Sequence, residues 1–317
     1  MANEALSHVS LKIEKGLMTG LIGHTGCGKS TLLRMFNGLL RPDSGRILLD
    51  GADIWESPKE IVRVRFRVGL VMQYPEYQLF DETVRSDIAY GPRNMGLDEA
   101  EIAERVREAA AFSGLADSLL DKSPFELSGG QKRRAAIAGV MAMRPEILIL
   151  DEPAAGLDPK GREDIFTGLE LYRKSSGATV VIVSHSMEDM ARCCQRLAVM
   201  SDGRICLYGT QSEVFGNAEK LQSLGLGVPE ITRICSRLRQ AGMQLTADFG
   251  GGCSGDSSAS RRCEGCLKIL RLGSISAGIL FCTERIRAQK LYWRWFISSR
   301  SFLSKARRAL LLSFCLR

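Results

Sequence analysis

A glycine-rich segment at residues 23–30 restricts the fold of this chain more than any other part of its sequence. It reads GHTGCGKS, which fits the pattern GxxxxGK[ST]. An apolar run at 17–23 leads into it, and an amphipathic run at 31–40 follows it. Strand, loop and helix in this order are the setting in which such a loop binds phosphate groups. The sequence therefore predicts an α/β fold built around a phosphate site.

The residues of this loop have separate expected roles. Glycines allow backbone N–H groups to turn inward around phosphate oxygens at the positive N-terminus of a helix. We expect Lys29 to reach the β- and γ-phosphates of ATP and Ser30 to bind a Mg²⁺ ion. Cys27 is interpreted as a small residue that fits the loop, not as a nucleophile. The expected nucleotide contacts in this region are Gly23, His24, Thr25, Gly26, Cys27, Gly28, Lys29, Ser30 and Thr31.

Two adjacent carboxylates, Asp151 and Glu152, follow a second apolar run at 147–150. Open α/β sheets bind ligands at the carboxyl ends of their strands, so both side chains are expected at the phosphate site. Asp151 is predicted to hold the Mg²⁺, directly or through water, and Glu152 to orient and deprotonate the water that attacks the γ-phosphate. An acidic pair standing alone is more often a helix cap or a solvated turn, but the upstream loop favours the catalytic interpretation.

A second glycine-rich segment, LSGGQ at 127–131, lies between the loop and the carboxylates. Ser128 and Gln131 have the spacing of a capping box that opens a helix over 132–143. The backbone of Gly129 and Gly130 and the N–H groups of the first helical turn can face an anion. A helix start without a ligand is the simpler meaning of these residues in isolation. The order of the segments favours a second phosphate-facing surface.

Apolar runs that alternate with helical patterns indicate an α/β core. A third apolar run lies at 179–183, a helix is expected to start at Asp98 with Glu101, and residues 201–203 read as a hairpin turn. We expect one domain over 1–245, with a β-rich stretch near its start and a helical insert at about 92–145.

The net charge of +7 is unevenly distributed along the chain. Residues 246–317 hold 13 Lys and Arg against 4 Asp and Glu, whereas residues 1–245 hold 30 against 32. A nearly neutral body lacks the basic surface that nucleic-acid backbones attract, so no nucleic-acid partner is expected. No apolar run reaches the roughly 20 residues of a membrane-spanning helix, and no secretory signal is visible. The expected compartment is the cytoplasm, with any membrane contact peripheral.

These segments together resemble the ATP-binding cassette (ABC) ATPases. The resemblance rests on the phosphate loop, Gln73, LSGGQ, the carboxylate pair, residues 155–158 and His185, and it covers residues 5–245. It implies a P-loop NTPase core of ABC type with an antiparallel β subdomain and a helical signature subdomain. Cassettes of this family pair head to tail, so that each ATP lies between one subunit's phosphate loop and the other's LSGGQ segment.

The resemblance also implies roles for residues outside the loop. Residues 128–131 would contact the ATP that the partner subunit binds. His185 would contact the γ-phosphate in its own subunit, and Asp158 would link the two sites across the interface. Gln73 would sense Mg²⁺ and the attacking water, while the segment after it touches a membrane partner.

That segment indicates a subfamily. Residues 73–80 read QYPEYQLF, and Thr83-Val84 and the sequence DIAYGPRNMG at 87–96 follow. This looks like the ATP-binding subunits of energy-coupling factor (ECF) transporters, which take up vitamins or transition-metal ions. In that family the exposed segment receives the coupling helices of the transmembrane component. Ordinary core filling is the alternative role of Tyr74, Tyr77 and Phe80.

The ECF resemblance implies a peripheral protein on the cytoplasmic face of the cell membrane. Its expected partners are a second ABC ATPase subunit, identical or related, an ECF transmembrane component and a substrate-binding membrane protein. One alternative is a soluble ABC ATPase acting on nucleic acid or ribosomes, but such proteins usually carry long coiled-coil inserts or two cassettes in one chain. The other is a nucleotide-binding regulator without turnover, against which Glu152 and His185 argue.

Both ends of the chain depart from the family pattern. The family begins with a strand and an aromatic residue that stacks on adenine, but no Phe, Tyr or Trp precedes Phe36 here, so the start is expected to be truncated. The tail at 246–317 is expected to be disordered, and its single CxxC pair, Cys263 and Cys266, is weak evidence for zinc.

A frameshift is our hypothesis for the tail. Read from the third base of each codon, residues 265–302 can encode a segment beginning MLEDITLGQYF, which looks like the start of an ECF transmembrane component. The codons of Trp293 and Trp295 are fixed, and one unchanged frame carries the whole match. Stop codons in that frame of the DNA would rule the hypothesis out.

Overall fold

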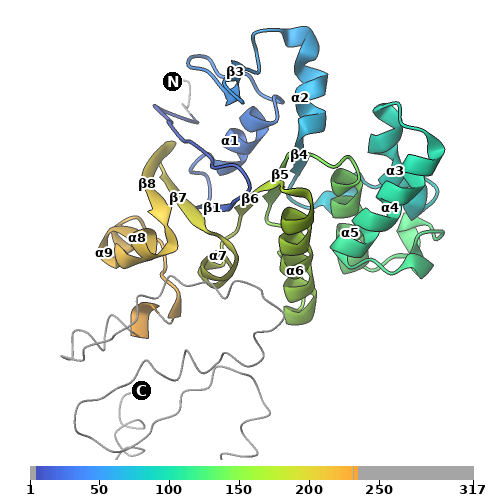
Figure 1. Cartoon of the computed structure of the whole chain (residues 1–317). Helices are drawn as coiled ribbons and strands as arrows, with labels where there is room; N and C mark the ends of the chain where they lie inside the picture. Colours follow the sequence, from blue (N-terminus) through green and yellow to red (C-terminus); the bar gives the residue numbers. More distant parts are fainter. Residues whose placement is uncertain (1–4, 231, 235–317) are drawn as a thin grey trace, which may run out of the picture. The chain divides into compact units, whose positions relative to one another are not determined.

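The computed structural model describes residues 5–230 and 232–234, and in them a six-stranded sheet forms the centre of the fold (Figure 1). The strands lie in the order β4-β5-β6-β1-β7-β8, and all neighbours are parallel except β7 and β8, which are antiparallel. Their bounds are β1 (Met18–Gly23), β4 (Val68–Val71), β5 (Ile147–Asp151), β6 (Thr179–Val183), β7 (Arg196–Ser201) and β8 (Arg204–Thr210). This confirms the predicted α/β class.

Helices cover both faces of this sheet. In Figure 1, α1 (Lys29–Phe36) lies on one side and α6 (Pro159–Ser176) and α7 (Met187–Cys193) lie on the other. Side chains alternate along the strands, so β1 places Leu21 in the apolar cluster under α1 and Ile22 in the larger cluster on the opposite face. Parallel strands covered in this way are apolar on both faces, which explains the continuous apolar runs in the sequence.

Two smaller parts flank the sheet. A short antiparallel pair, β2 (Leu48–Leu49) and β3 (Ala52–Asp53), precedes η1 (Pro58–Glu60) and α2 (Ile61–Arg67). After β4, the chain forms η2 (Pro75–Gln78), α3 (Val84–Asn94), α4 (Glu99–Ser113), η3 (Asp117–Leu119), η4 (Pro124–Glu126) and α5 (Gly129–Met141). After β8, it forms α8 (Gln211–Gly216) and α9 (Ala218–Ser223).

Local signals set several of these boundaries. The Asp98 side chain accepts a hydrogen bond from the Glu101 N–H and caps α4, which confirms the predicted helix start. The antiparallel pairing of β7 with β8 confirms the predicted hairpin, whose turn contains Asp202 and Gly203, both with positive φ. The helix predicted over 132–143 begins three residues earlier, because the first helical turn includes Gly129 and Gly130.

The chain divides into two units, Met1–Ser257 and Ser258–Arg317, and every described residue belongs to the first. The predicted disordered tail, its Cys263 and Cys266 and the frameshift hypothesis therefore lie outside the described residues. Among the described helices, none combines the length and apolar content needed to cross a lipid bilayer.

Because Gly168 has no side chain, the backbone of α6 can pack directly against the backbone of α4. A Cβ at this position would lie 1.8 Å from the carbonyl oxygen of Phe112, near the end of α4. Gly168→Ala should therefore lower the free energy of unfolding by about 3 kcal/mol, because neither backbone can give way. Urea denaturation of the full chain measures this. The control is Gly139→Ala in α5, where a Cβ would be 3.8 Å from the Ile88 Cα; it should stabilise by about 0.5–1 kcal/mol. Equal effects of the two substitutions would contradict the close approach.

Candidate active site

The glycine-rich loop at 23–30 joins the end of β1 to the start of α1, as the sequence predicts. Gly28 is the N-cap of α1 and has φ +98°, a conformation that side chains other than glycine rarely adopt. A Cβ there would also lie 2.5 Å from the Ala5 carbonyl oxygen. The backbone path of the loop therefore requires glycine at 28 on two independent grounds.

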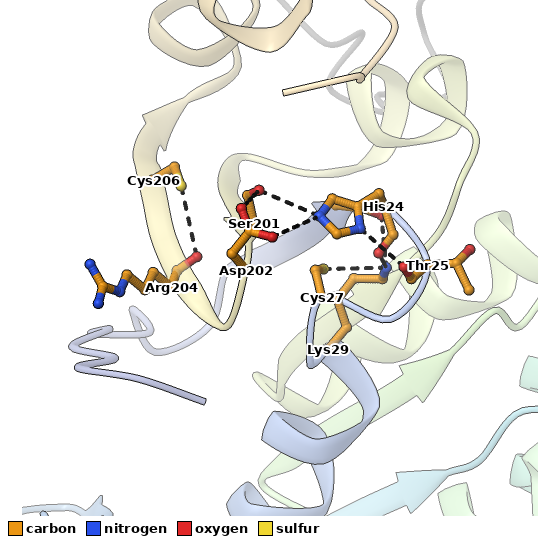
Figure 2. Close-up of polar contacts among 9 residues, drawn as sticks. His24, Thr25, Cys27, Lys29, Ser201, Asp202, Arg204 and Cys206 are labelled. Atoms are coloured by element: carbon orange, nitrogen blue, oxygen red, sulfur yellow. Dashed lines mark hydrogen bonds and ion pairs between the residues drawn. The ribbon is translucent and has the colours of Figure 1, made fainter. Parts of the chain in front are cut away.

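Lys29 is buried, and its ammonium group points back into the loop (Figure 2). Its Nζ donates hydrogen bonds to the carbonyl oxygens of Gly23, at 2.7 Å, and His24, at 2.9 Å, and lies 3.8 Å from Cys27 Sγ. The positive charge is thus held within the curve of the loop. Cys27 packs into the apolar cluster under α1, Thr31 is half-buried, and Thr25 and Gly26 are exposed.

His24 is exposed and turns away from Lys29 toward the hairpin between β7 and β8 (Figure 2). Its Nε2 lies 3.4 Å from Ser201 Oγ and 3.8 Å from Asp202 Oδ1. The backbone N–H of Gly203 donates to the Cys27 carbonyl oxygen at 3.2 Å. The hairpin turn therefore braces the loop from the side, a contact that the sequence did not predict.

Ser30 and Asp151 meet at the start of α1 and the end of β5. Ser30 Oγ donates a hydrogen bond to Asp151 Oδ2 at 2.7 Å. Both residues line a cavity of about 200 Å³, together with Gln73 and Tyr74 of the segment after β4. The structure thus brings together the three side chains that the sequence predicted as metal ligands.

The donor set fits Mg²⁺, which binds oxygen ligands and usually takes only one or two carboxylates, with phosphate and water oxygens completing its shell. Ser30, Asp151 and Gln73 offer one hydroxyl, one carboxylate and one amide oxygen at the edge of this cavity. No group of three or more His, Cys, Asp or Glu side chains that could hold a metal by itself occurs in the described part of the chain. The three protein oxygens leave room in the octahedral shell of Mg²⁺ for water and phosphate oxygens.

Glu152 is buried beside His185. It has φ +54°, and its backbone N–H donates to the Val183 carbonyl oxygen at 3.0 Å, which fixes it at the ends of β5 and β6. Glu152 Oε1 lies 3.4 Å from His185 Nε2. Burial, and then the neighbouring Asp151, raise the pKa of the Glu152 carboxyl to about 7. A base whose pKa lies near neutrality is suited to accept a proton from water.

The His185 side chain is more than half exposed. Partial burial, and then the charge of Lys29, lower its pKa, so the neutral imidazole is favoured at neutral pH. Lys29 also lowers the pKa of Glu152, which opposes the effect of burial. The charge of Lys29 thus lowers the pKa of both side chains, which places the loop, Glu152 and His185 in one electrostatic environment.

The LSGGQ segment forms the predicted capping box at the start of α5. Gln131 N–H donates to Ser128 Oγ at 3.4 Å, and Ser128 N–H donates to Gln131 Oε1 at 2.9 Å. Ser128 and Gly129 are exposed, while Gly130 is half-buried. Within the described residues, no hydrogen bond or ion pair joins 128–131 to the loop at 23–30. The structure therefore does not gather this segment into the same cluster as Lys29 and Glu152.

Asp158 is exposed and caps α6 by accepting a hydrogen bond from the Gly161 N–H at 3.2 Å. Its loop approaches the LSGGQ segment, since a Cβ on Gly130 would lie 3.2 Å from Leu157 Cδ2. The predicted site residues thus fall into two groups within the chain. One surrounds the phosphate loop, and the other consists of residues 128–131 and the loop that ends at Asp158.

Sequence reasoning missed Arg133, which lies in α5 two residues after Gln131. Its side chain is 5% exposed and forms an ion pair with Glu76. The sequence does contain a signal for its burial. Arg133 lies four residues before Ile137 and eight before Met141, which places it on the buried face of α5. A charged residue on such a face requires a buried partner.

The aromatic residues after Gln73 are not core residues. Tyr74 is 51% exposed, Tyr77 is 85% exposed and Phe80 is 61% exposed, so the core-filling alternative is wrong for all three. Pro75 is buried and Leu79 packs against the main apolar cluster, which anchors the segment. The rings therefore form a surface patch on an anchored backbone.

Comparison with known proteins identifies the family of this chain. The profile of the family described as ABC transporter matches residues 6–155. The energy-coupling factor transporter ATP-binding protein EcfA2 of Clostridium perfringens is 51% identical over 246 residues, which cover 77% of this chain and 86% of that protein. EcfA2 of Caldanaerobacter subterraneus is 51% identical over 247 residues, which cover 78% and 86%. The chain belongs to the family of ECF transporter ATP-binding proteins.

Solved structures agree with this family and with the predicted ABC fold. The structure of cbiO1 from Clostridium perfringens, described as part of the ABC transporter complex cbiONQ, matches with a TM-score of 0.63 and 42% identity, over 73% of this chain and 92% of that one. The ATP-binding cassette MJ0796, in a dimer bound to ADP and Pi, matches with a TM-score of 0.60 and 29% identity, over 65% of this chain and 90% of that one.

The raised pKa of Glu152 should make stability depend on pH in the protein without nucleotide and with EDTA. The folded chain keeps this carboxyl protonated up to about pH 7, whereas the unfolded chain releases the proton near 4.5. The wild type should therefore lose about 2 kcal/mol of stability relative to Glu152→Gln as pH rises from 4.5 to 7. Urea denaturation of both proteins across pH 4.5–8.5 measures the difference. A difference that stays flat across this range would show that the pKa of Glu152 is not raised.

Proposed function

We propose that this chain binds and hydrolyses ATP as one of two cassettes that power an ECF-type importer. The observation that carries the proposal is the convergence of Ser30, Asp151, Glu152 and His185 on the phosphate loop, in a chain 51% identical to ECF transporter ATP-binding proteins. Such an arrangement supplies the parts that phosphoryl transfer to water needs, namely phosphate binding, a metal position and a base.

The chain's own residues divide this chemistry among them. Lys29 and the N–H groups of the loop hold the phosphates, and Ser30, Gln73 and Asp151 offer oxygen ligands for Mg²⁺. When bound, Mg²⁺ would neutralise charge on the phosphate oxygens. Glu152 orients the attacking water and accepts its proton. His185, next to Glu152, contacts the γ-phosphate.

Residues 128–131 and Asp158 serve a second ATP, bound by a partner cassette. This is supported by the exposure of Ser128 and Gly129 at the start of α5, where backbone N–H groups can bind an anion, and by the lack of contact with the chain's own loop among the described residues. The related cassette MJ0796 is described as a dimer. The partner would be an identical or a related ATPase subunit.

The exposed patch of Tyr74, Tyr77 and Phe80 is the docking surface for the transmembrane component. Phe80 packs edge-on against Tyr90 of α3, with 5.0 Å between ring centroids, so the patch continues onto that helix. Exposed aromatic residues on an anchored backbone are characteristic of protein interfaces. Docking there would hold the chain at the cytoplasmic face of the cell membrane, where a separate membrane protein would bind the vitamin or transition-metal ion to be imported.

The alternative, an ATPase acting on nucleic acid or ribosomes, has less support. The similar proteins are described as transporter ATP-binding proteins. Residues 1–245 have a net charge of −2, which does not favour binding to the phosphate backbone of a nucleic acid. The expected partner is therefore a membrane protein.

Replacing Glu152 by Gln tests the catalytic role. The amide keeps the size of the side chain but cannot accept the proton, so ATP hydrolysis should fall by about 100-fold or more. Binding of ATP, measured by equilibrium dialysis with Mg²⁺, should stay within about threefold. Glu163→Gln, an exposed carboxyl on α6, is the control and should hydrolyse ATP normally. Full hydrolysis by Glu152→Gln would remove Glu152 from the role of base.

Replacing Tyr77 by Ser tests the docking surface. Tyr77 is 85% exposed, so the substitution should leave the folded chain intact, while co-purification with membrane proteins should fall by about tenfold if the ring anchors the interface. Quantitative mass spectrometry of the purified complexes measures this. Tyr208→Ser in β8, also an exposed tyrosine, should co-purify as the wild type does. If the wild type recovers nucleic acid or ribosomal proteins instead of membrane proteins, the transporter proposal fails.

A further inference from the structure

Arg133 is a buried charge that the proposed chemistry does not use. It lies near the N-terminus of α5, just after the LSGGQ segment, and only 5% of its side chain is exposed. Its ion-pair partner Glu76, in η2, is only 17% exposed. Two charges removed from water to this extent are costly to separate, because either one would remain unpaired in a low-dielectric environment.

The geometry of the pair is bidentate. Arg133 Nε donates to Glu76 Oε2 at 3.0 Å, and its Nη2 donates to Glu76 Oε1 at 2.8 Å. The third nitrogen, Nη1, donates to the carbonyl oxygen of Ala155. A planar guanidinium held on two sides fixes the direction as well as the distance of its partners.

These contacts join three functional segments of the chain. Glu76 lies between Gln73 and the exposed ring of Tyr77 in the proposed docking segment. Ala155 lies in the loop between Glu152 and Asp158. Arg133 itself belongs to the helix whose first turn is proposed to face the partner's ATP. One side chain thus connects the docking segment, the LSGGQ helix and the loop after the catalytic carboxylate.

A separate close approach of the two segments supports this connection. A Cβ on Gly130 would lie 3.2 Å from Leu157 Cδ2, so the start of α5 and the 155–158 loop are also adjacent on the side of Gly130. A shift of one segment against the other would have to change the hydrogen bonds of Arg133. A displacement of Glu76 by a docked partner would therefore reach both segments.

We propose that Arg133 is a positioning residue that transmits docking of the membrane component to the surface that meets the partner's ATP. The inference rests on the proposed docking function. Arg133 is not among the residues proposed to bind nucleotide or metal; it acts through Glu76 and Ala155. Lysine cannot replace it, since an ammonium group makes a point contact and cannot hold Glu76 in two places while also reaching Ala155.

The test compares Arg133→Lys with a matched arginine. Arg134 neighbours it on α5 and is also paired with a carboxylate and a carbonyl, Asp164 at 3.0 Å and Gly114 at 2.8 Å, but those partners lie outside the three segments. In the complex that co-purifies with the wild type, ATP hydrolysis is measured over a range of ATP concentrations. We expect Arg133→Lys to lower kcat about tenfold with KM for ATP within about twofold, and Arg134→Lys to change neither.

Glu76→Gln and the double variant show whether the two residues act as a unit. Each single substitution and the double substitution should lower kcat by the same factor, because each removes the same connection. Multiplied effects in the double variant would overturn the inference. Glu76→Gln keeps Arg133 and its bond to Ala155, so it also provides an answer if Arg133→Lys folds poorly.

Hydrogen exchange separates positioning from plain stabilisation. In the wild type, exchange in residues 127–131 and 153–158 should slow when the chain is assembled with its membrane partners, and in Arg133→Lys it should not. Equal slowing in both proteins, or a kcat ratio equal to that of Arg134→Lys, would overturn the inference. Failure of the wild type to bind membrane proteins would instead overturn the docking proposal.

Discussion

The parallel pairing of β1, β5 and β6 is the constraint on which the rest of the molecule depends. Leu21 of β1 and Asp151 of β5 both lie in register with Val183 of β6, so all three strands end at the same edge of the sheet. The segments that directly follow them carry Lys29, Glu152 and His185. Ser30 and Asp151 are 121 positions apart in the chain, but they become neighbours because their strands are parallel, and they can hydrogen-bond without any special loop.

Charge burial at this edge is tolerated because the charges offset one another. Lys29 is satisfied by carbonyl oxygens of its own loop and lowers the pKa of Glu152, while burial and Asp151 raise it. The result is a carboxyl that is neither a strong acid nor permanently protonated near neutral pH. The buried charge of Arg133 is instead offset directly by its ion pair with Glu76. Glu152 can thus gain or lose its proton near neutral pH, whereas Arg133 is held in one position by its partner.

Local patterns predicted much of this structure, and long-range contacts account for what they missed. The loop at 23–30, the capping box of Ser128 and the hairpin at 201–203 are each encoded within a few residues. The brace between His24 and Ser201 spans 177 positions, and the pair of Arg133 with Glu76 spans 57, so neither leaves a local signal. Exposure of Tyr77 also depends on packing, because an aromatic residue in a loop can fill a core or form an interface. The sequence identifies residues of the site, but only the tertiary structure shows which of them lie close enough to change one another's pKa.

The outward-facing start of α5 has a consequence for mixtures of intact and damaged subunits. Ser128 and Gly129 are exposed and make no hydrogen bond to the chain's own phosphate loop within the described residues. In a head-to-tail pair, a subunit with a damaged LSGGQ segment would therefore keep its own loop and carboxylates but spoil the site of its neighbour. If one subunit has a damaged phosphate loop and its partner has a damaged LSGGQ segment, both defects lie in the same ATP site. The second ATP site of the pair then remains intact. Genetic complementation between two defective copies would then report which residues share an ATP.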